Sequence, residues 1–230
     1  MNILVIAAHP DDEVLGCGGT MAKYAKEGHD VYTLILGEGV TSRDEKRDKN
    51  KRKKELRELE KNAASANKAL GVKDLILHNF PDNRFDTIAM LDIIKVIERV
   101  KSDIGPDMVF THHHGDLNID HQLTQKAVLT AFRPNSREKV IGIFAFEIPS
   151  STEWSGPFAK SWFMPNYFVD ISRTLGNKTS AMKKYKSEVR DYPHPRSLEA
   201  IQINAKAWGI KAGGIAAVEA FSVIRQIDGI

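Results

Sequence analysis

The chain has 230 residues, of which 42% are hydrophobic and 27% charged, and its formal net charge is +3 with a pI of about 8.8. This is the balance of an ordinary globular protein that can bury a sizeable core. The single cysteine, Cys17, excludes an intramolecular disulfide, and no apolar stretch approaches the roughly 18 residues of a membrane-spanning helix. Because the first residues do not resemble a signal peptide, we expect a cytoplasmic protein.

Strand-like and helix-like segments alternate along the first two thirds of the chain. Short apolar runs predict strands at residues 2–8, 31–36, 75–79, 107–114 and 140–147. Helical spacing predicts helices at residues 14–28, 44–70, 87–102 and 120–132. This alternation predicts an α/β fold with a Rossmann-like, mostly parallel sheet and helices on both faces, in a single domain over residues 1–230.

The pattern changes after Glu147. Residues 148–165 are rich in Ser, Pro, Gly and Trp and predict a long loop. A further strand is expected near residues 167–172, and helices near residues 171–188 and 198–214.

Polar residues follow each of the five predicted parallel strands. They lie at residues 9–13, 37–43, 80–86, 112–121 and 147–154. In open α/β sheets ligands bind beyond the carboxyl ends of the strands. The agreement between five strand ends indicates a binding site more strongly than any one cluster.

The segment "AHPDDE" carries the most specific chemistry. His9 and Asp12 are three residues apart across a proline turn, so both side chains can face one point, and His121 lies in a second polar cluster, "GDLNIDHQ". Two histidines and a carboxylate are the ligands of a catalytic zinc that keeps a position for water. Asp11 would be left free as a general base that takes the proton of this water.

Simpler interpretations exist for both clusters. Asp11 or Asp12 could cap a helix by accepting hydrogen bonds from free backbone amides, with Glu13 completing the cap or holding a ligand. Taken alone, the histidines at 112–114 favour a solvated loop for at least two of the three. The two clusters together, each at a strand end, favour a metal site.

These motifs resemble the LmbE/PIG-L family of zinc-dependent N-acetylglucosaminyl deacetylases. "AHPDDE" and "GDLNIDHQ" carry the resemblance, and "GEGVTSR", "FPDNRFD", "EIPSSTEW", "YPHPRS" and "VEAF" extend it over nearly the whole chain. The resemblance implies one zinc ion per chain held by His9, Asp12 and His121. It also implies Asp11 as the base and an N-acetylglucosamine-type amino sugar as the substrate.

One position departs from the family pattern. Many members have "HxDH" at the second cluster, where the first histidine stabilises an oxyanion or protonates the leaving amine, but this chain has Asn118. Asn118 can donate a hydrogen bond but cannot supply a proton. His194 of "YPHPRS" is our preferred proton donor, with His114 or Asp11 acting twice as alternatives. Asp120 is expected to orient a neighbouring group.

Four further residues are candidates for substrate binding. Arg43 and Arg84 could bind hydroxyls or a phosphate, and Asp82 and Asn83 could bind sugar hydroxyls. Turn chemistry alone could explain Asp82 and Asn83, and Arg43 could be a surface residue.

The sequence offers three rival functions. The glycines in "GCGG" lack the spacing of a phosphate loop, so we interpret them as close-packing residues rather than as part of a phosphosugar or nucleotide site. Residues 42–61 are basic but mix acidic residues with basic ones and lack aromatics, so no nucleic-acid partner is expected. A hydrolase of another N-acylated amine stays open, as do Fe(II), Co and Ni as metals. The family resemblance implies a homo-oligomer of unspecified size.

Overall fold

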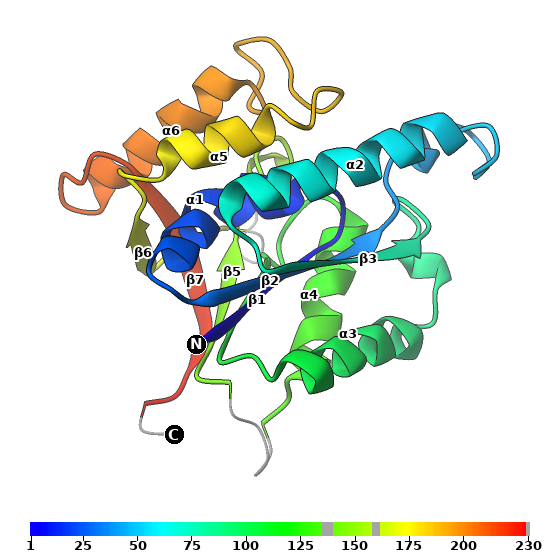
Figure 1. Ribbon diagram of the computed structural model, residues 1–230, viewed down its shortest axis with the longest axis horizontal. Coiled ribbons are helices and arrows are strands. Elements are labelled where there is room, and N and C mark those ends of the chain that lie inside the picture. Colours follow the sequence, from blue (N-terminus) through cyan, green and yellow to red (C-terminus); the bar gives the residue numbers. More distant parts are fainter. Residues whose placement is uncertain (135–139, 158–161, 229–230) are drawn as a thin grey trace.

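The computed structural model describes residues 1–134, 140–157 and 162–228 of the chain. All its strands form one seven-stranded sheet in the order β3-β2-β1-β4-β5-β7-β6 (Figure 1). The strands are β1 Asn2–Ala7, β2 Asp30–Gly37, β3 Asp74–Phe80, β4 Met108–His112, β5 Gly142–Phe146, β6 Tyr167–Asp170 and β7 Val218–Gln226. The helices are α1 Asp12–Lys26, α2 Lys53–Leu70, α3 Met90–Ile104, α4 Ile119–Ala131, α5 Leu175–Met182 and α6 Leu198–Lys211.

Strands β1 to β5 run parallel, which confirms the predicted α/β class. The central strands β1, β4 and β5 are almost wholly buried, as expected of continuous apolar runs covered on both faces. The sheet reverses its winding between β1 and β4, and their carboxyl ends lie on either side of this point. An open sheet forms a ligand crevice at such a position.

Helices cover both faces of the sheet and form two separate cores. Helices α1, α2, α5 and α6 lie on one face, and α3 and α4 lie on the other (Figure 1). Alternate residues of β1 enter different cores: Val5 and Ala7 pack on the α1 side, while Leu4 and Ile6 pack on the α3 side. Within the described residues, no helix has the length and apolarity needed to cross a bilayer.

The last strand, β7, was not predicted from the sequence. It lies between β5 and β6 and pairs antiparallel with both, so the sheet is mixed at this edge. Its sequence, VEAFSVIRQ, places glutamate and arginine among apolar residues, and no clear alternation identifies it. Glu219 is nevertheless buried, because it has specific partners.

The helix predicted at residues 44–70 begins only at Lys53. Asp44 has extended backbone angles and accepts hydrogen bonds from Lys51 and Arg52. These contacts close residues 44–52 into a loop next to the end of β2. The charged residues of this segment have helical spacing, so the sequence predicted a helix there instead of a loop. The predicted loop at 148–165 contains one 3₁₀ turn, Thr152–Trp154, and its residues 158–161 lie outside the described residues.

Helix α1 is broken at Cys17, whose φ of −148° is not helical. Buried Glu219 accepts hydrogen bonds from the freed amides of Gly19 and Thr20, at 2.9 and 2.7 Å. Lys178 donates to the freed carbonyl of Leu15 and to Glu219, at 2.7 and 2.6 Å. This pair therefore satisfies the backbone on both sides of the break.

The glycines near the break are close-packing residues, as predicted. A Cβ atom on Gly16 would meet the ring of Phe146 at 2.4 Å, and one on Gly19 would meet Ile171 at 2.7 Å. Helix α1 can therefore approach β5 and the segment after β6 only where side chains are absent.

We predict that Glu219→Gln lowers the free energy of unfolding by about 3–5 kcal/mol, because it leaves the buried Lys178 charge without its counter-charge. Urea unfolding at neutral pH measures this. The control is Asp30→Asn, which breaks the exposed ion pair with Lys73 and should cost less than about 1 kcal/mol. Equal costs for the two variants would contradict the prediction.

Candidate metal centre

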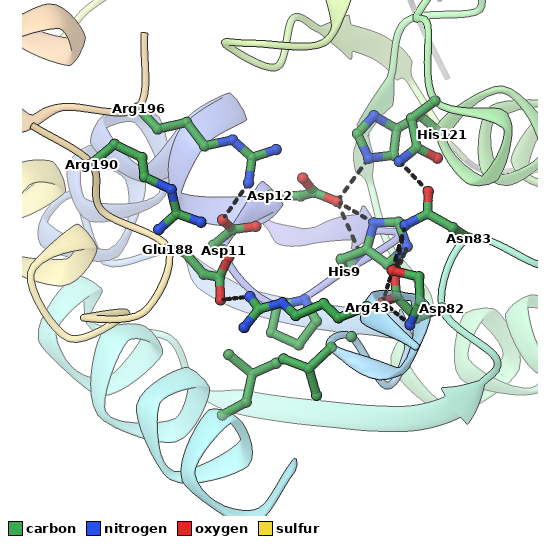
Figure 2. A pocket seen from close by; sticks show the side chains of 16 residues that line it. His9, Asp11, Asp12, Arg43, Asp82, Asn83, His121, Glu188, Arg190 and Arg196 are labelled. Atoms are coloured by element: carbon green, nitrogen blue, oxygen red, sulfur yellow. Dashed lines mark hydrogen bonds and ion pairs between the residues drawn. The ribbon is translucent and has the colours of Figure 1, made fainter. Parts of the chain in front are cut away.

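A cavity of about 260 Å³ opens at the carboxyl ends of β1, β2 and β3 and at the start of α4 (Figure 2). It brings together residues that are far apart in the sequence. The lining residues are His9, Pro10, Asp11, Asp12, Gly39, Val40, Ser42, Arg43, Leu59, Asp82, Asn83, Asn118, His121, Glu188, Arg190 and Arg196. Polar ends of separate strands thus converge, as the sequence predicted for the first four clusters.

The turn between β1 and α1 has an unusual backbone. Asp11 has φ 105° and ψ −28°, in the left-handed region that non-glycine residues seldom adopt. The amide of Asp11 donates to Glu13 at 3.0 Å, and the amide of His9 donates to Asp12 at 2.9 Å. These local bonds direct Asp11 and Asp12 toward the cavity, as Figure 2 shows.

His9, Asp12 and His121 offer one ligand atom each within 4.8 Å of one another. Asp12 Oδ2 lies 3.3 Å from His9 Nδ1 and 3.2 Å from His121 Nε2. Ligands bound to zinc at their usual lengths of roughly 2.0–2.1 Å, at tetrahedral angles, would be about 3.3 Å apart. The three residues therefore fit the ligand set of a metal ion.

The second nitrogen of each histidine faces a carboxylate. His9 Nε2 lies 3.0 Å from Asp120 and 3.3 Å from Asp82, and His121 Nδ1 lies 3.0 Å from Asp116. Asp120 also accepts from the amide of Phe85 at 2.9 Å. Such outer carboxylates orient ligating histidines and set their tautomers. Asp120 thus lies where a residue that orients a neighbour is expected.

The electrostatics of the three candidate ligands also suit a cation. Burial by itself lowers the pKa of His9 and of His121. The hydrogen bonds and charges of the surrounding carboxylates outweigh this effect, so the pKa of His121 rises to about 9 and the pKa of His9 rises well above its usual value. Burial raises the pKa of Asp12, but the charge of His121 holds it well below the usual range. The carboxylates therefore favour positive charge at this point of the cavity.

Arg196 is a residue that the sequence analysis missed. Its guanidinium donates to Asp11 at 3.1 Å, as Figure 2 shows, and to Ser150 at 2.8 Å. Burial raises the pKa of Asp11 well above its usual value, and the charge of Arg196 opposes this shift. Arg196 belongs to "YPHPRS", but nothing in that segment distinguished it from His194.

The prediction of a solvated loop for two of the histidines at 112–114 is wrong. His112 and His113 are buried, and only His114 is exposed. The ring of His112 stacks on His121 with centroids 4.1 Å apart and accepts a hydrogen bond from the amide of Ala8 at 2.8 Å. Burial, together with the charge of His121, lowers the pKa of His112. A neutral His112 ring therefore packs against the candidate ligand His121.

The other predicted site residues divide into two groups. Arg43, Asp82, Asn83 and Asn118 line the cavity. Arg84 and His194 are not among its lining residues. Arg84 donates to the carbonyl of Glu45, and His194 Nδ1 accepts from the amide of Arg196.

The side chain of Asn118 already makes two hydrogen bonds within the protein. Its side-chain oxygen caps α4 by accepting from the amide of Asp120, and its amide donates to Asn83, each at 2.8 Å. One side-chain N–H of Asn118 is left to donate to a ligand.

Comparison with known families assigns the chain. Residues 4–132 match the PIG-L family, described as GlcNAc-PI de-N-acetylase. The chain belongs to this family. It is 31% identical to the uncharacterized deacetylase YaiS of Escherichia coli K12, covering 81% of this chain and 91% of the relative. It is 30% identical to a diacetylchitobiose deacetylase of Thermococcus kodakarensis, covering 81% and 70%.

A solved structure of a different enzyme shares the fold. GalB of Pseudomonas putida KT2440, a 4-carboxy-2-hydroxymuconate hydratase, superposes with a TM-score of 0.75 over 100% of this chain and 99% of its own, at 21% identity. This likeness concerns the fold alone, and one fold can carry unrelated reactions.

We predict that Asp120→Asn weakens zinc binding about 10- to 100-fold, because the amide no longer holds His9 as a charged carboxylate does. Competition with a chelating dye measures the affinity. Asp86→Asn, at an exposed position of the same end of the sheet, should leave it unchanged. An Asp120→Asn variant with unaltered affinity would contradict the orienting role.

Proposed function

We propose that this protein is a zinc-dependent N-deacetylase that removes the acetyl group from an N-acetylglucosamine-type amino sugar or its conjugate. The observation that carries the proposal is the combination of three candidate ligands, His9, Asp12 and His121, with a buried carboxylate outside that ligand set, Asp11, in one cavity. The deacetylase names of the relatives and the family assignment support the same reaction.

A bound zinc ion would lower the pKa of a water molecule and polarise the acetyl carbonyl. Asp11 takes a proton from the attacking water. Burial raises its pKa, which makes it a stronger base than an exposed carboxylate, while the charge of Arg196 opposes this rise and its guanidinium orients the carboxylate. The remaining N–H of Asn118 is available to the oxyanion that develops on the carbonyl.

The leaving amine requires a proton. Of the three donors considered, His194, His114 and Asp11, only Asp11 lines the cavity. This favours Asp11 over His194 as the group that first accepts the proton and then returns it to the nitrogen as the C–N bond breaks. Acetate and the free amino sugar are then released.

The walls of the cavity suit a sugar. Asp82 accepts hydrogen bonds from the amide and hydroxyl of Ser42, and Asn83 lies between Asp82 and Asn118. Carboxylate and amide groups in this arrangement can exchange hydrogen bonds with ring hydroxyls. The volume is near the lower bound of about 300 Å³ for small-molecule pockets, which suits a single sugar residue at the reacting end.

A deacetylase domain over residues 1–230, a homo-oligomeric state and a cytoplasmic location remain predictions. Another N-acylated amine stays the alternative substrate, and Fe(II), Co and Ni stay alternative metals for a two-histidine, one-carboxylate set.

We predict that Asp11→Asn retains the zinc but lowers kcat by about 10²- to 10⁴-fold, the usual worth of a general base. Acetate release from N-acetylglucosamine and N,N'-diacetylchitobiose, with zinc content per chain, measures both effects. His9→Ala should lose the zinc as well, since it removes a ligand. A kcat near that of the wild type for Asp11→Asn would refute the assignment of the base.

Three arginines, Arg43, Arg190 and Arg196, line the cavity, and one of them favours substrates that carry a negative charge. Arg43 is paired with Glu188 at 2.8 Å, and Arg196 with Asp11. Arg190 donates only to the carbonyls of Ser187 and Val189, and it makes no ion pair within the described part of the chain. Its charge is therefore left to meet an anionic substituent on the substrate (Figure 2).

We predict that Arg190→Ala lowers kcat/KM for N-acetylglucosamine 1-phosphate by about 10-fold, the scale of one hydrogen bond to a charged group. It should leave kcat/KM for neutral N-acetylglucosamine unchanged. Lys186→Ala removes an exposed charge from the same segment, away from the cavity lining, and serves as the control. Equal losses for both substrates would contradict a charge-specific role.

A further inference from the structure

Glu13 is buried beneath the cavity and is not among its lining residues. One carboxylate oxygen accepts the amide of Asp11 at 3.0 Å. The other accepts the hydroxyl of Tyr185 at 2.6 Å and the side-chain amide of Asn67 at 2.9 Å. Glu13 thus connects the backbone of the proposed base to two residues from distant parts of the chain.

Those two residues are themselves fully enclosed. Tyr185 follows α5 and is 0% exposed, and Asn67 lies on α2 and is 2% exposed. The amide nitrogen of Asn67 also donates to the carbonyl of Ala63 at 2.9 Å, while its oxygen is buried and meets no donor in the described part of the chain. Glu13 and the carbonyl of Ala63 therefore both accept from the nitrogen of the Asn67 amide and set its orientation, while the oxygen of the amide is left unpaired. Native structures seldom carry such an oxygen without a reason.

A simple helix cap does not account for this arrangement. The cap requires only the bond from the Asp11 amide to Glu13, and an exposed glutamate could make it while water solvates its other oxygen. Here the other oxygen is shielded from solvent and given two specific donors. The φ of 105° at Asp11 also has to be held against its own strain, and the Glu13 bond acts directly on that residue.

We propose that Tyr185 and Asn67 are positioning residues that act through Glu13 to hold the backbone of Asp11, and thereby the aim of its carboxylate. The inference rests on the proposed role of Asp11 as the base. The segment after α5 would then hold Asp11 at two points, since Tyr185 acts on its backbone through Glu13 and Arg196 binds its side chain directly.

The test compares Tyr185→Phe with Tyr24→Phe. Both remove one hydroxyl from a buried tyrosine without changing the ring, and among the described residues the Tyr24 hydroxyl bonds only to that of Tyr167, at 3.2 Å, near the other end of α1. Tyr185→Phe should lose more thermal stability than Tyr24→Phe, because the hydroxyl of Tyr185 donates to a buried carboxylate. Only Tyr185→Phe should lower kcat, by about 10-fold, the scale of one lost hydrogen bond. Its KM and zinc content should stay unchanged.

A second readout needs no substrate. Hydrogen exchange of the Asp11 amide, followed by NMR, reports the bond to Glu13. Exchange should accelerate at least several-fold in Tyr185→Phe and stay unchanged in Tyr24→Phe. If the wild type releases no acetate, the proposed function fails, but the exchange comparison still decides whether Tyr185 holds Asp11.

Three outcomes would overturn the inference. The first is a kcat for Tyr185→Phe within twofold of the wild type. The second is unchanged exchange at Asp11. The third is a joint loss of kcat and zinc, which would assign the contact to the metal ligand Asp12. If Tyr185→Phe does not fold, Asn67→Ala replaces it, with the same expected directions and the same criteria.

Discussion

The site depends on the turn that joins β1 to α1. Four residues within positions 9–13 divide its tasks: His9 and Asp12 face a common point, Asp11 faces the cavity beside them, and Glu13 turns back into the protein. This division requires the left-handed backbone at Asp11, a conformation that costs of the order of 1–3 kcal/mol outside glycine. The surrounding structure has to compensate for that cost.

The compensation comes from elements that reach the turn from several directions. Helix α2 contributes Asn67, the segment after α5 contributes Tyr185 and Arg196, and the start of α4 contributes Asp120 behind His9. The site is therefore not a loop resting on a finished fold. Each of these contacts is a hydrogen bond, buried for Asn67, Tyr185 and Asp120 and partly buried for Arg196, so the packing of the helices and the geometry of the cavity are determined together.

Charge is balanced over the cavity in the same way. Its carboxylates stand beside histidines or arginines, and the outer aspartates Asp116 and Asp120 hold the second nitrogen of each candidate ligand. A divalent cation would meet an environment that already favours positive charge. Metal binding and the orientation of the ligands are thus two results of one arrangement of buried carboxylates.

The sequence by itself determined the class of fold and indicated the candidate inner residues of the site. Apolar runs alternating with helical patterns identified the five parallel strands, and "AHPDDE" and "NIDH" identified His9, Asp11, Asp12 and His121, because local spacing and strand-end position are readable along the chain. Only the tertiary structure decided the rest. β7, Arg196, Tyr185, Asn67 and the burial of His112 depend on contacts between residues that are distant in sequence. No local pattern shows which buried polar side chain will find its partner there.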